Sequence, residues 1–183
     1  MALEHAILVS LSEQPRRPAS GLDLTRRFDR SIGFFWSATH QQIYRVLARM
    51  DADGWVRSRH VAQRGRADKK VYVVTAAGRA ELRRWIAEPS PVEQFRSDVA
   101  VKLRGAAYAD RPRMLEQVAA HRAEHATRLA HYEQLAARDF PEPTGLSAHE
   151  LDVHLVLRGG IRLEQFWVDW LTEVLDAHEG AAA

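Results

Sequence analysis

The 183-residue sequence contains no cysteine, which excludes disulfide frameworks, thiolate metal sites and cysteine nucleophiles. It has no apolar run near the roughly 20 residues that cross a bilayer, and its start, MALEHAILVSLSEQ, is amphipathic without a basic leader or cleavage site. We therefore expect a cytoplasmic protein with no membrane partner. The chain also has no GxSxG, Walker or GxGxxG sequence. We expect no enzymatic activity, no catalytic residue, no cofactor and no metal.

The charge is small in total but unevenly distributed. The formal net charge is +2, from 26 Lys and Arg against 24 Asp and Glu. Residues 1–90 hold 16 basic and 9 acidic residues and the remainder 10 and 15, so the two parts carry +7 and −5. A basic half favours nucleic-acid binding, because Lys and Arg neutralise phosphates and release counterions. The alternative is an uneven scatter of charges in an arginine-rich composition.

Proline-containing segments divide the chain. Pro89, Ser90 and Pro91 interrupt a helical pattern, which predicts a linker because proline restricts its neighbour and lacks a donor. We expect a DNA-binding domain over residues 1–88 and a helical domain over residues 92–178.

Three helices are predicted in the first fifty residues of the basic half. Apolar residues at helical spacing predict a first helix that ends before Pro15. Ser20 is expected to cap a second helix, which Gly33 ends. Ser37 is expected to cap a third helix that runs to about Asp53.

After the third helix, the pattern of apolar residues changes from helical spacing to one typical of β-strands. Trp55 to Val74 is rich in β-forming residues and predicts a two-stranded hairpin with its loop at Arg64 to Asp68. Thr75 is then expected to cap a fourth helix. Three helices, a hairpin and a helix are the elements of a winged helix-turn-helix, in which one helix enters the major groove and the hairpin reaches the flanking backbone.

The third helix has two chemically distinct faces. A helical wheel places Ile43, Val46, Leu47 and Met50 inward, and places Gln41, Arg45 and Ala48 outward with Tyr44 at one flank. Gln and Arg can pair with adenine and guanine edges, and His and Thr at a helix N-terminus suit phosphate or base contacts. The hairpin loop adds the cations Arg64, Arg66, Lys69 and Lys70, which suit phosphate contact. A solvated charged face is the alternative for this cluster.

Three runs in this half form a recognisable set of motifs: FFW-x-A-x-HxQIY at Phe34 to Tyr44, L-x-RM-x-x-DGWV at Leu47 to Val56, and DKKVY-x-VT-x-x-GR at Asp68 to Arg79. Together they resemble the PadR family of bacterial transcriptional regulators. The resemblance implies a winged helix-turn-helix and a dimeric repressor, with release by small aromatic ligands in some members. It assigns Ser37, Thr39, His40, Gln41 and Tyr44 to the recognition helix, and Lys69 and Lys70 to the wing.

The acidic half is predicted to be helical. One helix is expected over Arg113 to Arg138, and a second opens with a capping box of Ser147 and Glu150. The second helix carries an apolar stripe that exceeds what one neighbouring helix can cover, so we expect it to form a homodimer interface. The dimerisation residues are expected to be Leu163, Phe166, Trp167, Trp170, Leu171 and Val174. This half resembles the helical domain of PadR proteins related to virulence activators.

Several features of the acidic half have alternative interpretations. Gly159 and Gly160 indicate close helix approach, a kink or a break, and we favour the first two. His121 and His125 have the i, i+4 spacing of metal ligands, and His131 lies further along the same helix, but a solvated helix face is favoured. Trp167 and Trp170 could stack on a planar effector, but core or dimer contacts are favoured.

The sequence thus predicts a mainly α protein with an N-terminal winged helix-turn-helix, a β-hairpin wing and an α-helical dimerisation domain. Its partners are expected to be a palindromic double-stranded DNA operator, a second copy of the chain and a small-molecule effector. The alternative function is a winged-helix adaptor for protein contacts. An adaptor would need a more apolar outward face on the third helix than Gln41 and Arg45 provide.

Overall fold

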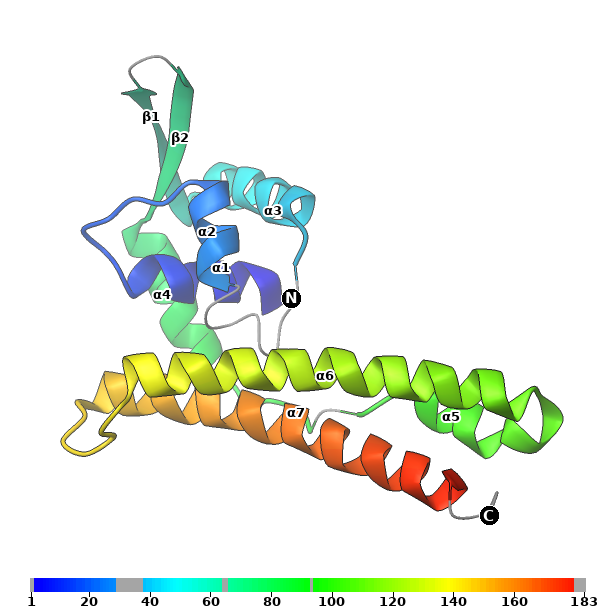
Figure 1. The fold of residues 1–183 in the computed structure, drawn as a ribbon. Coiled ribbons are helices and arrows are strands. Elements are labelled where there is room, and N and C mark those ends of the chain that lie inside the picture. The colour runs from blue at the N-terminus through cyan, green and yellow to red at the C-terminus, as the bar shows by residue number, and fades with distance from the viewer. Residues whose placement is uncertain (1, 29–37, 64–65, 93, 180–183) are drawn as a thin grey trace. The chain divides into compact units, whose positions relative to one another are not determined.

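The computed structural model describes residues 2–28, 38–63, 66–92 and 94–179. It divides into two compact units, Met1–Pro91 and Val92–Ala183 (Figure 1). Each unit has its own group of buried apolar side chains. No helix in the described ranges has the length and apolar character needed to cross a bilayer.

The described part of the first unit contains four α-helices and one hairpin, in the predicted order. These elements are α1 (Ala2–Ser12), α2 (Gly21–Phe28), α3 (His40–Ala52), β1 (Val56–Gln63), β2 (Arg66–Val74) and α4 (Ala76–Ile86). The inward side chains of α1, α2 and α3 meet in one core with the start of the hairpin. Its fully buried members include Ile7, Leu8, Leu24, Ile43, Leu47 and Met50.

Local hydrogen bonds set the starts of the helices. At the start of α2, the Ser20 N–H donates to the Asp23 carboxylate at 2.9 Å, and the Asp23 N–H donates to the Ser20 hydroxyl at 3.3 Å. The prediction that Ser37 caps α3 is wrong, because the N-cap is Thr39. The Thr39 hydroxyl accepts from the Gln42 N–H at 3.3 Å, and the Gln42 side chain accepts from the Thr39 N–H at 2.8 Å. Ser37 has histidine three residues later, which cannot complete this capping box. Ser37 itself and Gly33 lie outside the described residues.

The hairpin is longer than expected. Its antiparallel register runs from Val56 opposite Val74 to Gln63 opposite Arg66, with an irregularity between Val61 and Gln63. The predicted loop over Arg64 to Asp68 is therefore wrong in extent, because β2 already begins at Arg66. At the irregularity, two residues of β2, Ala67 and Asp68, lie opposite the single residue Ala62 of β1, and the pairing resumes at Gln63 and Arg66.

The second unit is an antiparallel helix pair with a short helical segment beside it. Its elements are α5 (Asp98–Arg104), the short 3-10 turn Ala106–Tyr108, α6 (Arg111–Asp139) and α7 (Ala148–Glu179). Helices α6 and α7 lie side by side along most of their lengths (Figure 1). The inward residues of α6 are Met114, Val118, Leu129, Tyr132 and Leu135, which are all buried.

Helix α7 has the predicted N-terminal capping box and is continuous along its length. The predicted capping box is confirmed, because the Ser147 N–H donates to Glu150 at 2.8 Å and the Glu150 N–H donates to the Ser147 hydroxyl at 3.3 Å. The helix runs without interruption through Gly159 and Gly160. A break at this glycine pair is therefore excluded.

Candidate nucleic-acid interface

The outward face of α3 is polar and open to solvent. The four residues predicted to point inward, Ile43, Val46, Leu47 and Met50, are all buried. On the opposite side, Gln41, Tyr44, Arg45 and Ala48 are exposed. The burial of the apolar residues fixes the rotation of α3, and this rotation presents an amide, a phenol and a guanidinium on one side.

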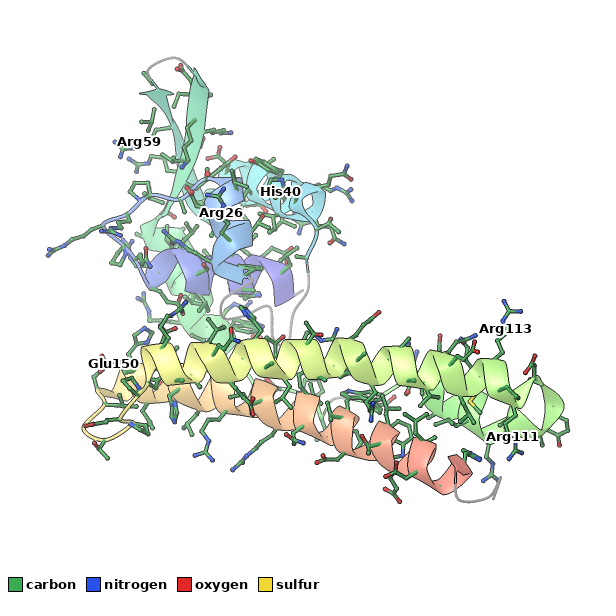
Figure 2. All side chains as sticks on the ribbon, viewed as in Figure 1. Arg26, His40, Arg59, Arg111, Arg113 and Glu150 are labelled. Atoms are coloured by element: carbon green, nitrogen blue, oxygen red, sulfur yellow. The ribbon has the colours of Figure 1, made fainter. Side chains whose placement is uncertain are left out.

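Tyr44 is held against the start of α2. Its ring contacts His40 edge-on, with 5.2 Å between the ring centres. A β-carbon built on Gly21 would lie 2.6 Å from Tyr44 Cζ, so the missing side chain of Gly21 leaves room for the phenol ring. Half of the Tyr44 surface is nevertheless open, at 44% exposure. Figure 2 shows His40 at the start of α3.

Lys69 and Lys70 of β2 both form ion pairs with helix carboxylates. Lys69 Nζ lies 2.8 Å from Asp23 Oδ2 of α2, and Lys70 Nζ lies 3.3 Å from Asp51 Oδ2 of α3. The Ser58 hydroxyl of β1 also donates to Asp51, at 2.6 Å. Both ammonium groups, which were expected to contact phosphate, therefore also connect the hairpin to the helices.

The pKa values of the paired groups reflect these contacts. The hydrogen bond from Ser58 is the main cause that holds the pKa of Asp51 below its ordinary value, with Lys70 contributing. Asp51 in turn raises the pKa of Lys70. Burial opposes ionisation of Asp23, but bonds from Lys69 and Ser20 outweigh it and lower the pKa of this carboxyl. All three groups are therefore charged at neutral pH.

The remaining expected wing residues are only partly described. Arg64 lies outside the described residues, as Ser37 does. Arg66 is the first residue of β2.

Two exposed arginines of β1 were missed by the sequence analysis. Arg57 and Arg59 are both exposed, and neither forms an ion pair with a described residue. They are two apart in a strand and so share one face of it. Arg26 of α2 is also exposed, and Figure 2 labels Arg26 and Arg59. The alternating R-x-R pattern in a predicted strand is the signal that could have identified the β1 pair.

The predicted dimerisation stripe of α7 is divided between two environments. Leu171 is completely buried within the same chain. Trp167, Trp170 and Val174 are half-buried and pack against the same core. Leu163 and Phe166 are 38% and 51% exposed, so these two have the largest exposed fractions among the six residues.

His125 does not lie on a solvated face as expected. Its Nδ1 lies 2.6 Å from Glu164 Oε2, and its ring stacks on Trp167 with 4.8 Å between ring centres. Arg128 Nε donates to the other oxygen of Glu164 at 3.1 Å. The expectation is wrong for His125 because α7 covers this position of α6, whereas His121 and His131 are exposed. Within the described ranges, no three potential ligands are grouped to hold a metal ion.

Two protein families match the chain in succession. The description "Transcriptional regulator PadR-like family" matches residues 7–84, which include α2, α3 and the hairpin. The description "Virulence activator alpha C-term" matches residues 95–179, which include α6 and α7.

Similar proteins match over nearly the full length. The Mycobacterium tuberculosis "Probable transcriptional regulator Rv1176c" is 53% identical over 187 residues, which is 97% of each chain. The Vibrio cholerae virulence activator AphA has 33% identity and a TM-score of 0.77, with 99% of both chains covered. Bacillus subtilis PadR in complex with operator DNA has 26% identity and a TM-score of 0.79, covering 97% of this chain and 99% of that one. The complex of B. subtilis PadR with p-coumaric acid has 25% identity and a TM-score of 0.72, covering 97% and 98%.

Proposed function

The chain belongs to the PadR-like family of transcriptional regulators, and on this premise we propose that it is a homodimeric repressor that binds a palindromic DNA operator in the cytoplasm. The observation that carries this proposal is the outward face of α3, where Gln41, Tyr44 and Arg45 are exposed beside one another. A protein-binding adaptor would present apolar side chains at these positions, so DNA binding is the function that this face supports best.

The exposed face of α3 supplies the groups for reading bases. Arg45 can form two parallel bonds to guanine, and Gln41 can form them to adenine. His40 and Thr39 lie at the N-terminus of the helix, where phosphate or base contacts are favoured. Ser37 extends this contact region in the proposal.

The hairpin supplies contacts to the DNA backbone. Each ammonium of Lys69 and Lys70 has donors left after its carboxylate contact, because an ammonium group has three. We assign these donors to phosphates, together with Arg64 and Arg66. The exposed Arg57 and Arg59 of β1 add two guanidinium groups with no carboxylate partner in the described part of the chain.

A second copy of the chain is the proposed partner of α7. Leu163 and Phe166 are exposed large apolar residues three apart on one helix, and they would be covered by the same surface of the other copy. Trp167, Trp170 and Val174 would border the contact, with Leu171 supporting it from the core. Two recognition helices related by a two-fold axis match the two halves of a palindrome one helical turn apart.

A small aromatic effector is the proposed signal for release. B. subtilis PadR has a complex with p-coumaric acid as well as one with operator DNA. If an effector binds the DNA-free protein more tightly than the DNA-bound protein, it lowers the operator affinity by the ratio of these two effector affinities. The proposal for this chain is therefore repression that a small aromatic molecule relieves.

The recognition face can be tested once genomic footprinting with the purified protein has located an operator. We expect Arg45→Ala to reduce the ratio of operator to random-DNA affinity by about 10- to 100-fold, because a bidentate base contact is lost. Fluorescence anisotropy measures both affinities. Arg83→Ala is the matched control, since Arg83 is an exposed arginine on α4. An unchanged ratio for Arg45→Ala would refute the assignment of α3 as the recognition helix.

A further inference from the structure

Two carboxylates connect the wing, formed by β1 and β2, to the helices beside it. Asp51 of α3 accepts from the Ser58 N–H of β1 at 3.1 Å and from the Ser58 hydroxyl at 2.6 Å. Lys70 Nζ of β2 lies 3.3 Å from the same carboxylate, and Lys69 Nζ lies 2.8 Å from Asp23 of α2. We infer that Asp51 and Asp23 are positioning residues that determine specificity: they hold the wing in the orientation that the operator requires and weaken binding to other DNA.

This inference rests on the proposed function, because Asp51 lies on the helix that carries the proposed base contacts. Asp51 and Arg45 belong to the same 13-residue helix, α3. The carboxylate of Asp51 accepts bonds from both strands of the wing, so it fixes the direction of the wing as well as its distance from the recognition face. The Lys70 ammonium is held from a second side, because it lies 5.3 Å from the centre of the buried Tyr72 ring.

The same pairs reduce the net positive charge that the wing brings to DNA. Random DNA is bound mainly through charge, since contacts between cations and phosphates release counterions. A lysine beside a carboxylate adds little net charge, so the two carboxylates lower the affinity for random DNA. Operator binding requires in addition that the phosphate contacts are in register with the base contacts of α3. The carboxylates maintain this register and so oppose only the binding that depends on charge alone.

A purely structural role is the alternative for these pairs. The side chains of Lys69 and Lys70 are 33% and 40% exposed, and exposed ion pairs contribute little to stability. If the pairs only stabilised the fold, removing a carboxylate would weaken binding to both kinds of DNA. If they only reduced the charge, its removal would strengthen binding to both by the same factor. The ratio of operator to random-DNA affinity changes only if the carboxylates also position the wing.

Asp51→Asn and Asp23→Asn test the inference in the full-length protein, by fluorescence anisotropy with the footprinted operator and with random duplex DNA of the same length. Asparagine removes the charge but keeps a side-chain oxygen for the N–H of Ser58 or Ser20. We expect the affinity for random DNA to rise about three- to fivefold, the weight of an exposed ion pair, and its salt slope to steepen by up to about one unit. Operator affinity should not rise, so the ratio should fall at least about threefold.

Asp53→Asn is the matched control. Asp53 is the exposed C-cap of α3 and forms no ion pair with a described residue. Its substitution removes the same charge from the same end of the helix, so it should leave the ratio unchanged. Ser58→Ala supplies the converse test, because it removes a bond to Asp51 without changing any charge. We expect it to lower the ratio while the salt slope stays that of the parent.

An Asp51→Asn protein with the ratio of the parent would overturn the inference, as would an equal fall of the ratio in Asp53→Asn. If urea denaturation shows that Asp51→Asn is unfolded, Asp23→Asn decides. A parent protein with no preference for the operator would refute the proposed function and this inference with it. A parent that prefers the operator, with a ratio that the substitutions leave unaltered, would refute only the inference.

Discussion

At the scale of single residues, Gly78 shows how tightly α4 is seated on the hairpin. A β-carbon at this position would lie 2.1 Å from the carbonyl oxygen of Trp55. The same oxygen accepts from the Thr75 N–H at 3.0 Å and from the Thr75 hydroxyl at 3.1 Å. The first turn of α4 is thus packed directly on backbone atoms, which cannot move aside as a side chain can.

We expect Gly78→Ala to lower the free energy of unfolding by about 1–2 kcal/mol. Alanine usually stabilises a helix by about 1 kcal/mol over glycine, but the contact with Trp55 forces α4 to shift, and overpacking against a backbone atom belongs at the upper end of its usual cost, about 2–3 kcal/mol. Urea denaturation measures the change. Gly105→Ala is the control, because its β-carbon would meet nothing closer than 3.6 Å. A Gly78→Ala protein as stable as the parent would contradict the close packing.

Glu81 gives the first unit a stability that depends on pH. Bonds from Arg84 and then from His5 lower the pKa of Glu81 from 4.5 to about 2. In the unfolded chain this carboxyl takes up a proton near its ordinary pKa, whereas in the folded protein it stays ionised. Below pH 4.5 the unfolded state therefore binds more protons, and the contribution of Glu81 to stability is lost as the pH falls toward 2.

Glu81→Gln should consequently be less stable than the parent at pH 7, with a difference that shrinks between pH 4.5 and 2. The shift in urea midpoint between the two proteins, measured at several pH values, isolates this one group from the other carboxyls. Glu116→Gln, which changes an exposed carboxyl of α6, serves as the comparison. A difference that stays constant down to pH 2 would contradict the ion pairing of Glu81.

At the scale of elements, the hairpin could be predicted from the sequence, but its connections to the helices could not. The β-forming run and its glycine identify two strands, and the wheel of α3 identifies the buried residues correctly. The pairs Lys69–Asp23 and Lys70–Asp51 join residues distant in the chain, which a local pattern cannot contain. His125 was misjudged for the same reason, because only the packing of α7 reveals that Glu164 lies beside it.

These ion pairs allow a test of the two roles of the wing lysines. We expect replacing Lys69 and Lys70 together with Ala to weaken binding to all DNA sequences and to reduce the slope of log affinity against log salt by up to about two units. Anisotropy titrations at several salt concentrations give the slope, with Arg83→Ala as the control. A lower stability with an unchanged slope would show that the lysines only connect the hairpin to Asp23 and Asp51.

At the scale of the whole molecule, the chain joins a basic unit to an acidic one. The contrast of +7 against −5 was visible in the sequence, and the structure separates two compact units at Pro91. The spacing of the apolar stripe of α7 did not show which of its residues are buried within the chain and which are exposed. Leu171 is buried in a core shared with Met114 and Val118 of α6, while Phe166 is half exposed. A one-dimensional pattern cannot divide a broad stripe between an internal core and an external contact.

The exposed part of that stripe provides the test of dimerisation. We expect Leu163→Glu and Phe166→Glu to give monomers in sedimentation experiments, because each introduces a charge into an apolar contact. Their circular dichroism should remain that of the parent, since both side chains are exposed within one chain. Operator affinity should fall, because one winged helix then reads one half-site.

Gln134→Glu is the matched control, because it adds the same charge to an exposed position of α6, a helix that carries none of the predicted dimerisation residues. These substitutions test the interface more specifically than truncation after Pro143 would, because truncation would remove α7 and expose the buried side chains of α6. A Phe166→Glu protein that sediments as a dimer would place the interface elsewhere. A parent protein that sediments as a monomer would refute the homodimer itself. Operator binding would then have to rely on the contacts of a single α3.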